Sequence, residues 1–125
     1  MYLFILNVRH VLTKIRFTPS RINGMVTTQN ENLRRATAEV VERYRQKLGE
    51  KGRPLSFVRF AWELTHYTRP RGVKISYQAV KYWSDGRHSP DYLLVLHLLQ
   101  ISPPNSWQSA FAREILAAYN QGFPT

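Results

Sequence analysis

The sequence predicts an all-α protein of five helices. From Asn32 onward apolar residues recur at helical spacing, and serine, glycine and proline residues stand where these stretches begin and end. The same region shows no alternating strand pattern, no internal repeat and no low-complexity run. With 125 residues and 43% hydrophobic content, the chain is long enough for one compact domain and too short for two sizeable ones.

Residues 1–30 are an N-terminal extension that follows neither helical nor strand periodicity. The apolar stretch Met1 to Leu6 is too short to span a bilayer, and no cleavage site follows it, so we expect no secretory signal and no membrane partner. Because polar residues Thr27 to Asn30 separate Met25 from the first clean helix, we hypothesise that Met25 is the true start. The alternative is a short basic arm or strand packed on the domain.

The first expected helix runs from Asn32 to Leu48. Its inward stripe consists of Leu33, Thr37, Val40, Val41, Tyr44 and Leu48. On the opposite side, Glu39 and Arg43 have the i,i+4 spacing of an ion pair. Gly49, Gly52 and Pro54 end the helix.

The second and third helices each follow a serine that can cap them. Ser56 precedes a stripe made of Phe57, Phe60, Ala61 and Leu64. Ser76 precedes a helix that runs to Trp83, with Ala79, Val80 and Trp83 inward and with Tyr77, Gln78 and Lys81 outward. Gly86 fits the position just past this helix, where a positive φ is often needed.

The fourth and fifth helices complete the domain, which we place at residues 31–122. Pro90 suits the first turn of a helix that is apolar nearly all round and ends before Pro103. Asn105 or Ser106 caps the last helix, and Gly122 and Pro124 stop it. The inward face of that helix consists of Trp107, Ala110, Phe111, Ile115 and Ala118.

The charge balance favours a phosphate-bearing or membrane-surface partner. The net charge is +10, and its distribution is uneven. Eleven basic and three acidic residues lie between Arg43 and His88, a net charge of +8, whereas the segment from Ser89 to Thr125 carries −1. No cysteine is present, which excludes disulfides, thiolate metal sites and cysteine nucleophiles and is compatible with a cytoplasmic location.

Two segments resemble the phage lambda-repressor/Cro-like helix-turn-helix family. Val80, Trp83, Gly86 and Pro90 have the spacing of that family's recognition helix and following turn, and Leu55 to Leu64 resembles the preceding helix, with Ala61 at its small-residue position. The resemblance implies a five-helix lambda-repressor-like helix-turn-helix domain. The turn between the second and third helices is longer than in the family and carries a basic stretch, Arg69 to Gly72. Phe57 and Ser84 replace a glutamine and a glutamate of the family pattern.

The resemblance implies a sequence-specific double-stranded DNA-binding protein, a transcriptional regulator that inserts the helix Ser76 to Trp83 into the major groove. Tyr77, Gln78 and Lys81 would contact base edges, since glutamine can pair with adenine and lysine can reach guanine acceptors. Contacts to the sugar-phosphate backbone would come from Ser56, Arg59, Arg69, Arg71, Lys74, Ser76, Arg87 and His88. A homodimer is compatible with this type of binding.

Other functions remain open at this stage. An antitoxin-like module that binds a partner protein would use the same fold, and an exposed apolar patch around Leu94, Leu98 and Phe111 would favour it. RNA binding would need exposed aromatic residues, and Trp62 is a candidate because it lies at the edge of the apolar stripe of the second helix. At that position its side chain is either partly exposed or covers the lengthened turn between the second and third helices. We expect no enzyme activity, cofactor or metal, because the four histidines lack metal-ligand spacing and no catalytic motif occurs.

Overall fold

The computed structural model describes residues 23–122 of the chain, with side chains from Asn30 to Asn120. This part contains α2 (Asn23–Leu48), α3 (Phe57–Leu64), the short 3-10 helix η2 (Arg69–Arg71), α4 (Tyr77–Ser84), α5 (Tyr92–Ile101) and α6 (Trp107–Gly122). It contains no strand, and one isolated bridge joins Glu50 to Arg53. The all-α prediction is confirmed for the described residues.

The first helix is longer than predicted. α2 begins at Asn23 and not at Asn32, so the polar run Thr27 to Asn30 lies inside the helix. This run contains no glycine or proline, and an existing helix extends through polar residues at small cost. The apolar stripe therefore marks where α2 packs, not where it starts. The predictions that concern residues 1–22 and Pro124 lie outside the described residues.

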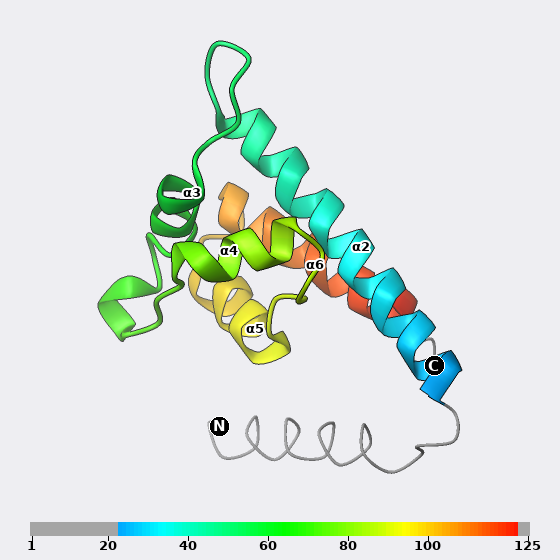
Figure 1. The fold of residues 1–125 in the computed structure, drawn as a ribbon. Coiled ribbons are helices and arrows are strands. Elements are labelled where there is room, and N and C mark those ends of the chain that lie inside the picture. Colours follow the sequence, from blue (N-terminus) through cyan, green and yellow to red (C-terminus); the bar gives the residue numbers. More distant parts are fainter. Residues whose placement is uncertain (1–22, 123–125) are drawn as a thin grey trace.

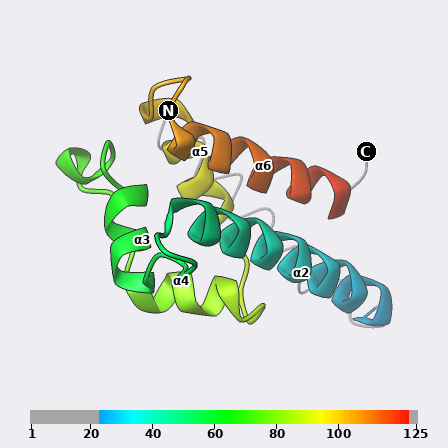
Figure 2. The ribbon, with the colours of Figure 1, turned by 90° about the horizontal axis from the view of Figure 1, so that it is seen from above.

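The helices enclose one core. α6 packs against α2 and α5, and α4 packs against α2 and α3. Figure 1 shows α4 in front of α6, and Figure 2 shows α4 on one side of α2 with α5 and α6 on the other, while α3 lies beyond the end of α2. Fully buried side chains from every one of these helices meet at the centre: Val41, Phe60, Leu64, Val80, Val95, Leu98, Phe111 and Ile115.

Aromatic rings join three of the helices in this core. Phe60 of α3 packs edge-on against Phe111 of α6, with ring centroids 5.6 Å apart, and Tyr44 of α2 packs against the same Phe111 ring at 5.4 Å. Trp107 lies 5.5 Å from Phe60. Such pairs stabilise a core beyond the area that they bury. They fix α3, and therefore its exposed face, relative to α2 and α6.

The serine caps are confirmed. The Ser56 hydroxyl accepts a hydrogen bond from the Arg59 amide at 3.1 Å, and the Ser76 hydroxyl accepts one from the Ala79 amide at 3.0 Å. Of the two alternatives for α6, Ser106 is the cap, and its hydroxyl accepts a hydrogen bond from the Ser109 amide at 3.2 Å. Gly86 has φ +75°, as its place after α4 predicts.

The start of α5 differs from the prediction. Asp91 is the N-cap, its carboxylate accepting a hydrogen bond from the Leu94 amide at 3.3 Å, and α5 begins at Tyr92. Pro90 therefore precedes the cap instead of occupying the first turn, and its carbonyl accepts a hydrogen bond from the Tyr119 hydroxyl. An aspartate is a strong N-cap, and it outweighs the preference of proline for the first helical position.

Arg43 does not form the predicted pair with Glu39. Its guanidinium contacts the Glu114 carboxylate of α6 at 2.7 Å, and the other oxygen of Glu114 accepts a 2.5 Å hydrogen bond from the Tyr44 hydroxyl. Burial and the hydrogen bond to Glu114 raise the pKa of Tyr44 to about 12. Burial alone would raise the pKa of Glu114, but the bonds from Tyr44 and Arg43 outweigh it and lower that pKa. A contact between helices thus replaces one within α2.

Candidate nucleic-acid interface

α4 has one buried side and one exposed side, as predicted. Val80 has no exposed surface and Trp83 is 4% exposed, so these two side chains anchor the helix in the core. Tyr77, Gln78 and Lys81 are all exposed, and Tyr77 is 56% exposed despite its large ring. The three predicted base-contacting residues therefore lie on the accessible side of α4.

Tyr82 adds a small cluster to the exposed side of α4. The Gln78 side-chain amide donates a 3.3 Å hydrogen bond to the Tyr82 hydroxyl. The His88 ring lies 5.3 Å from the Tyr82 ring, and the Arg87 guanidinium lies 5.6 Å from it. Because an amide group has two donor hydrogens and an acceptor oxygen, Gln78 keeps one donor and the acceptor available. Arg87 and His88 thus gather at the carboxyl end of α4, away from Tyr77.

The amino end of α3 contributes a second exposed surface. Ser56 and Arg59 are exposed, and Val58, between them, is 62% exposed. The Arg59 guanidinium contacts the Glu63 carboxylate at 2.8 Å, and its side chain is 64% exposed. An exposed pair of this kind contributes little stability, so the contact leaves Arg59 able to turn toward another anion at small cost.

The lengthened turn between α3 and α4 is a closed, hydrogen-bonded structure. Thr65 and Thr68 are buried, the Thr65 hydroxyl donates to the Ala61 carbonyl at 2.9 Å, and the Thr68 hydroxyl donates to the Val73 carbonyl at 3.0 Å. Gly72 ends η2 with φ +82°. The Thr65 hydroxyl therefore holds the start of the turn against α3, and Thr68 joins the start of the turn to its end. Figure 1 shows the turn projecting on the side of α3 that faces away from α2.

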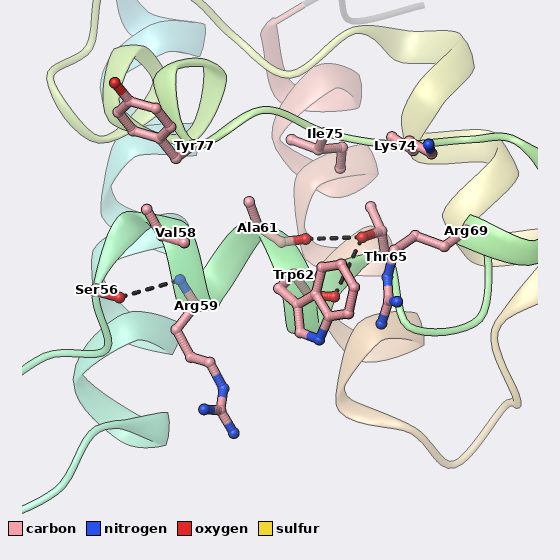
Figure 3. A pocket seen from close by; sticks show the side chains of 10 residues that line it. All are labelled: Ser56, Val58, Arg59, Ala61, Trp62, Thr65, Arg69, Lys74, Ile75 and Tyr77. Carbon is pink, nitrogen blue, oxygen red and sulfur yellow. Dashed lines mark hydrogen bonds between the residues drawn. The ribbon is translucent and has the colours of Figure 1, made fainter.

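A groove of about 460 Å³ runs between α3 and the segment that leads into α4. Figure 3 shows α3 forming one wall and the segment from Lys74 to Tyr77 the other, with Arg69 at one end. The lining residues are Ser56, Val58, Arg59, Ala61, Trp62, Thr65, Arg69, Lys74, Ile75 and Tyr77. The groove thus has an apolar floor and basic residues at its rim.

The structure brings some of the predicted backbone-contacting residues together and leaves others apart. Ser56, Arg59, Arg69 and Lys74 line the groove with Tyr77. Arg71, Ser76, Gln78 and Lys81 are exposed but do not line it. Among the side chains that the structure describes, the ion pairs are Arg43–Glu114, Arg45–Glu42 and Arg59–Glu63, so no acidic partner neutralises Arg69, Arg71, Lys74, Lys81 or Arg87.

Sequence reasoning missed two residues of this surface. Val58 was not singled out, although its position next to Phe57 and opposite the buried stripe of α3 indicates an outward side chain. Tyr82 was also missed, although it lies four residues after Gln78, the spacing at which helical side chains touch. For Trp62 the sequence allowed two alternatives, partial exposure or contact with the lengthened turn. The structure shows both, because Trp62 is 56% exposed and stacks on Arg69.

Two further features were sought in residues 23–122, a metal-binding cluster and a membrane-spanning helix. No cluster of three or more histidine, aspartate or glutamate side chains there could bind a metal ion. None of the helices in this region combines the length and the apolar composition needed to cross a bilayer. No protein-family model, curated protein or solved structure matches the chain.

Proposed function

We propose that this protein binds double-stranded DNA in a sequence-specific manner and acts as a transcriptional regulator with a helix-turn-helix of the lambda-repressor/Cro-like type. In this proposal α3 and α4 are the two helices of the unit, and α4 enters the major groove. The observation that carries it is the exposure of Tyr77, Gln78 and Lys81 on a helix whose other side is anchored by Val80 and Trp83.

The arrangement of charge supports the same proposal. The cations near α4 have no acidic partner among the described side chains, and they lie near the two ends of the helix: Arg69 and Lys74 near its amino end and Arg87 after its carboxyl end. The two strands of a duplex pass on either side of a helix that lies in the major groove. Phosphate contacts at both ends would fix the register in which α4 meets the bases.

Each residue of the exposed side then has a role. The Gln78 amide pairs with adenine through its free donor and its acceptor, and Lys81 donates to guanine acceptors. Tyr77 contacts a phosphate or a thymine methyl group. Ser56 and Ser76 use their hydroxyls as caps, so their part in binding is to hold the first amides of α3 and α4 toward a phosphate.

Selection of bound duplexes from a random DNA pool tests this proposal. The wild type is compared with a Gln78→Ala, Lys81→Ala double variant, and Gln100→Ala, an exposed glutamine of α5, is the matched control. We expect a recurring motif for the wild type and the control and its loss in the double variant. A palindromic motif would indicate a homodimer. Recovery of the same motif by the double variant would contradict base reading by α4.

A module that binds a partner protein is the second candidate. The patch that would favour it on α5 and α6 is closed, because Leu98 and Phe111 have no exposed surface and Leu94 packs against the core. The exposed apolar groups of Val58, Trp62 and Tyr77 offer a different surface for such a partner. No enrichment of any duplex by the wild type, at low as well as moderate salt, would move this candidate ahead of DNA binding. Enrichment of a motif from a random single-stranded RNA pool, tested in parallel, would favour the RNA alternative.

A further inference from the structure

Trp62 and Arg69 form a stacked pair at the end of the groove. The Arg69 guanidinium carbon lies 3.4 Å from the centroid of the Trp62 ring, and Figure 3 shows the two side chains side by side. Among the cation–π contacts of the described side chains this is the shortest, the next being Arg45 over Phe57 at 4.0 Å. Stacking on an indole ring orients the planar guanidinium group.

The guanidinium of Arg69 makes no hydrogen bond to any described residue. Its Nε atom is covered and has no acceptor, and no acidic side chain pairs with it. Stacking alone therefore positions this cation. Because Nε is covered, the two terminal nitrogens of the guanidinium are the donors left for a ligand, and as a planar pair they match two oxygens of a phosphate.

The backbone on both sides of the pair is fixed. The Arg69 amide donates to the Thr65 carbonyl at 2.8 Å, and its carbonyl accepts from the Gly72 amide at 2.9 Å. Trp62 lies in the last turn of α3, three residues before the buried C-cap residue Thr65. Since both side chains extend from rigid backbone, the stacked geometry exists before any ligand arrives.

Lys74 supplies a second cation at this end of the groove. It is exposed, lines the same groove and comes from the opposite wall. Two cations without acidic partners around one opening favour an anion, and the lengthened turn that carries them leads directly into α4.

We propose that Trp62 and Arg69 form a preset clamp for one phosphate of the DNA backbone, with Lys74 opposite, and that Trp62 acts as a positioning residue for the guanidinium. The inference rests on the proposed DNA binding and adds to it a function for the lengthened turn. The clamp contributes affinity equally for every sequence, because it contacts the backbone and not the bases.

The test is a set of titrations of labelled duplex DNA with the protein at several salt concentrations. Fluorescence anisotropy of the DNA measures the binding. The variants are Trp62→Ala, Arg69→Ala, their combination and Trp62→Phe, which keeps an aromatic face. We expect Arg69→Ala to weaken binding several-fold on selected and random duplexes alike and to make the log–log salt dependence shallower by about 0.9, the value for one phosphate. Trp62→Ala should weaken binding less and leave the salt dependence unchanged.

The coupling between the two positions distinguishes the clamp from two independent contacts. In the Arg69→Ala background, removal of Trp62 should have no further effect, and Trp62→Phe should bind nearly as the wild type does. Arg71→Ala is the matched control, since Arg71 lies on the same short helix but does not line the groove. In a Trp62→Ala, Arg71→Ala double variant, the fold-loss of duplex affinity should equal the product of the losses in the two single variants. Thermal unfolding of each variant separates loss of binding from loss of folding.

Three results would overturn the clamp. Independent effects of Trp62→Ala and Arg69→Ala would show that the ring does not position the guanidinium. An unchanged salt dependence in Arg69→Ala, together with loss of the motif in the Gln78→Ala, Lys81→Ala variant, would remove the clamp and keep the proposed function. Failure of the wild type to bind any duplex would remove both and would point to an acidic protein partner for this groove.

Discussion

Glu42 of α2 and Ser84 at the end of α4 are joined by a 2.6 Å hydrogen bond, which the Ser84 hydroxyl donates to the Glu42 carboxylate. The same carboxylate oxygen contacts the Arg45 guanidinium at 2.6 Å. Arg45 is 8% exposed, donates to the Leu55 carbonyl at 2.8 Å and stacks on the ring of Phe57. One carboxylate therefore connects the end of α4 with the start of α3, and so sets how the two helices lie relative to each other.

We predict that Arg45→Ala lowers the free energy of unfolding by about 3 kcal/mol, because it leaves the partly buried Leu55 carbonyl without this donor and removes a packed side chain. Ser84→Ala should cost about 1 kcal/mol. Chemical denaturation measures both. Glu39→Ala, an exposed glutamate on the same helix, is the control and should change stability by less than about 0.5 kcal/mol. A loss for Arg45→Ala no larger than for the control would contradict the role of Arg45.

The cap of α4 allows folding and binding to be separated. Ser76→Asp keeps a strong N-cap, so we expect the free energy of unfolding to change by less than about 0.5 kcal/mol. The new carboxylate lies at the amino end of the proposed reading helix and should weaken duplex binding through repulsion from phosphate. Ser106→Asp makes the same change at the cap of α6 and should leave affinity unaltered. Equal affinities for both variants would argue against a DNA strand near Ser76.

Glu114 should give the protein an acid-sensitive contribution to stability. Its pKa is lowered in the folded state, so the contribution is fully present above the pKa of the unfolded chain, about 4.3, and is lost as the pH falls through the lower folded value. Glu114→Gln removes this contribution. The difference between wild type and variant should be on the order of 1 kcal/mol at neutral pH, since the pair is partly exposed, and should shrink below about pH 4. Urea unfolding across this pH range checks it, and a difference independent of pH would contradict the ionic contact.

The turn after α2 contains one position that accepts no side chain. A Cβ atom on Gly49 would lie 1.9 Å from the Arg53 carbonyl oxygen, so we expect Gly49→Ala to destabilise the protein by more than about 2 kcal/mol or to prevent folding. Lys51 in the same turn has φ +52°, which a lysine adopts at a cost. Lys51→Asn, a residue that tolerates this conformation, should raise stability by roughly 0.5 kcal/mol. Thermal unfolding of the two variants should therefore shift in opposite directions.

Local signals in the sequence were sufficient for most of the helices. Ser56, Ser76 and Gly86 act within a few residues of their own positions, so their roles follow from spacing alone. Burial of Val80 and Trp83 follows from helical phase in the same way. The start of α2 could not be predicted, because a polar run without glycine or proline is compatible with helix and with coil.

Contacts between distant residues lay beyond the reach of sequence reasoning. Arg43 could choose between Glu39 on its own helix and Glu114 on another, and only the packing of α6 against α2 decides for Glu114. The same holds for the groove. Its basic residues were singled out one by one, but the stacking of Trp62 on Arg69 depends on the path of the turn between them.

The buried hydroxyls of Thr65 and Thr68 have a further consequence for the turn between α3 and α4. A flexible basic loop would lose conformational entropy when it met a ligand, at roughly 1 to 2 kcal/mol for each residue whose backbone becomes ordered. In this chain that loss occurs during folding, when Thr65 holds the start of the turn against α3 and Thr68 closes the turn. The free energy of electrostatic attraction between Arg69, Lys74 and an anionic ligand is then hardly reduced by an entropy cost of ordering the turn. Amide hydrogen exchange of the turn should accordingly be slow in the free protein and change little on binding.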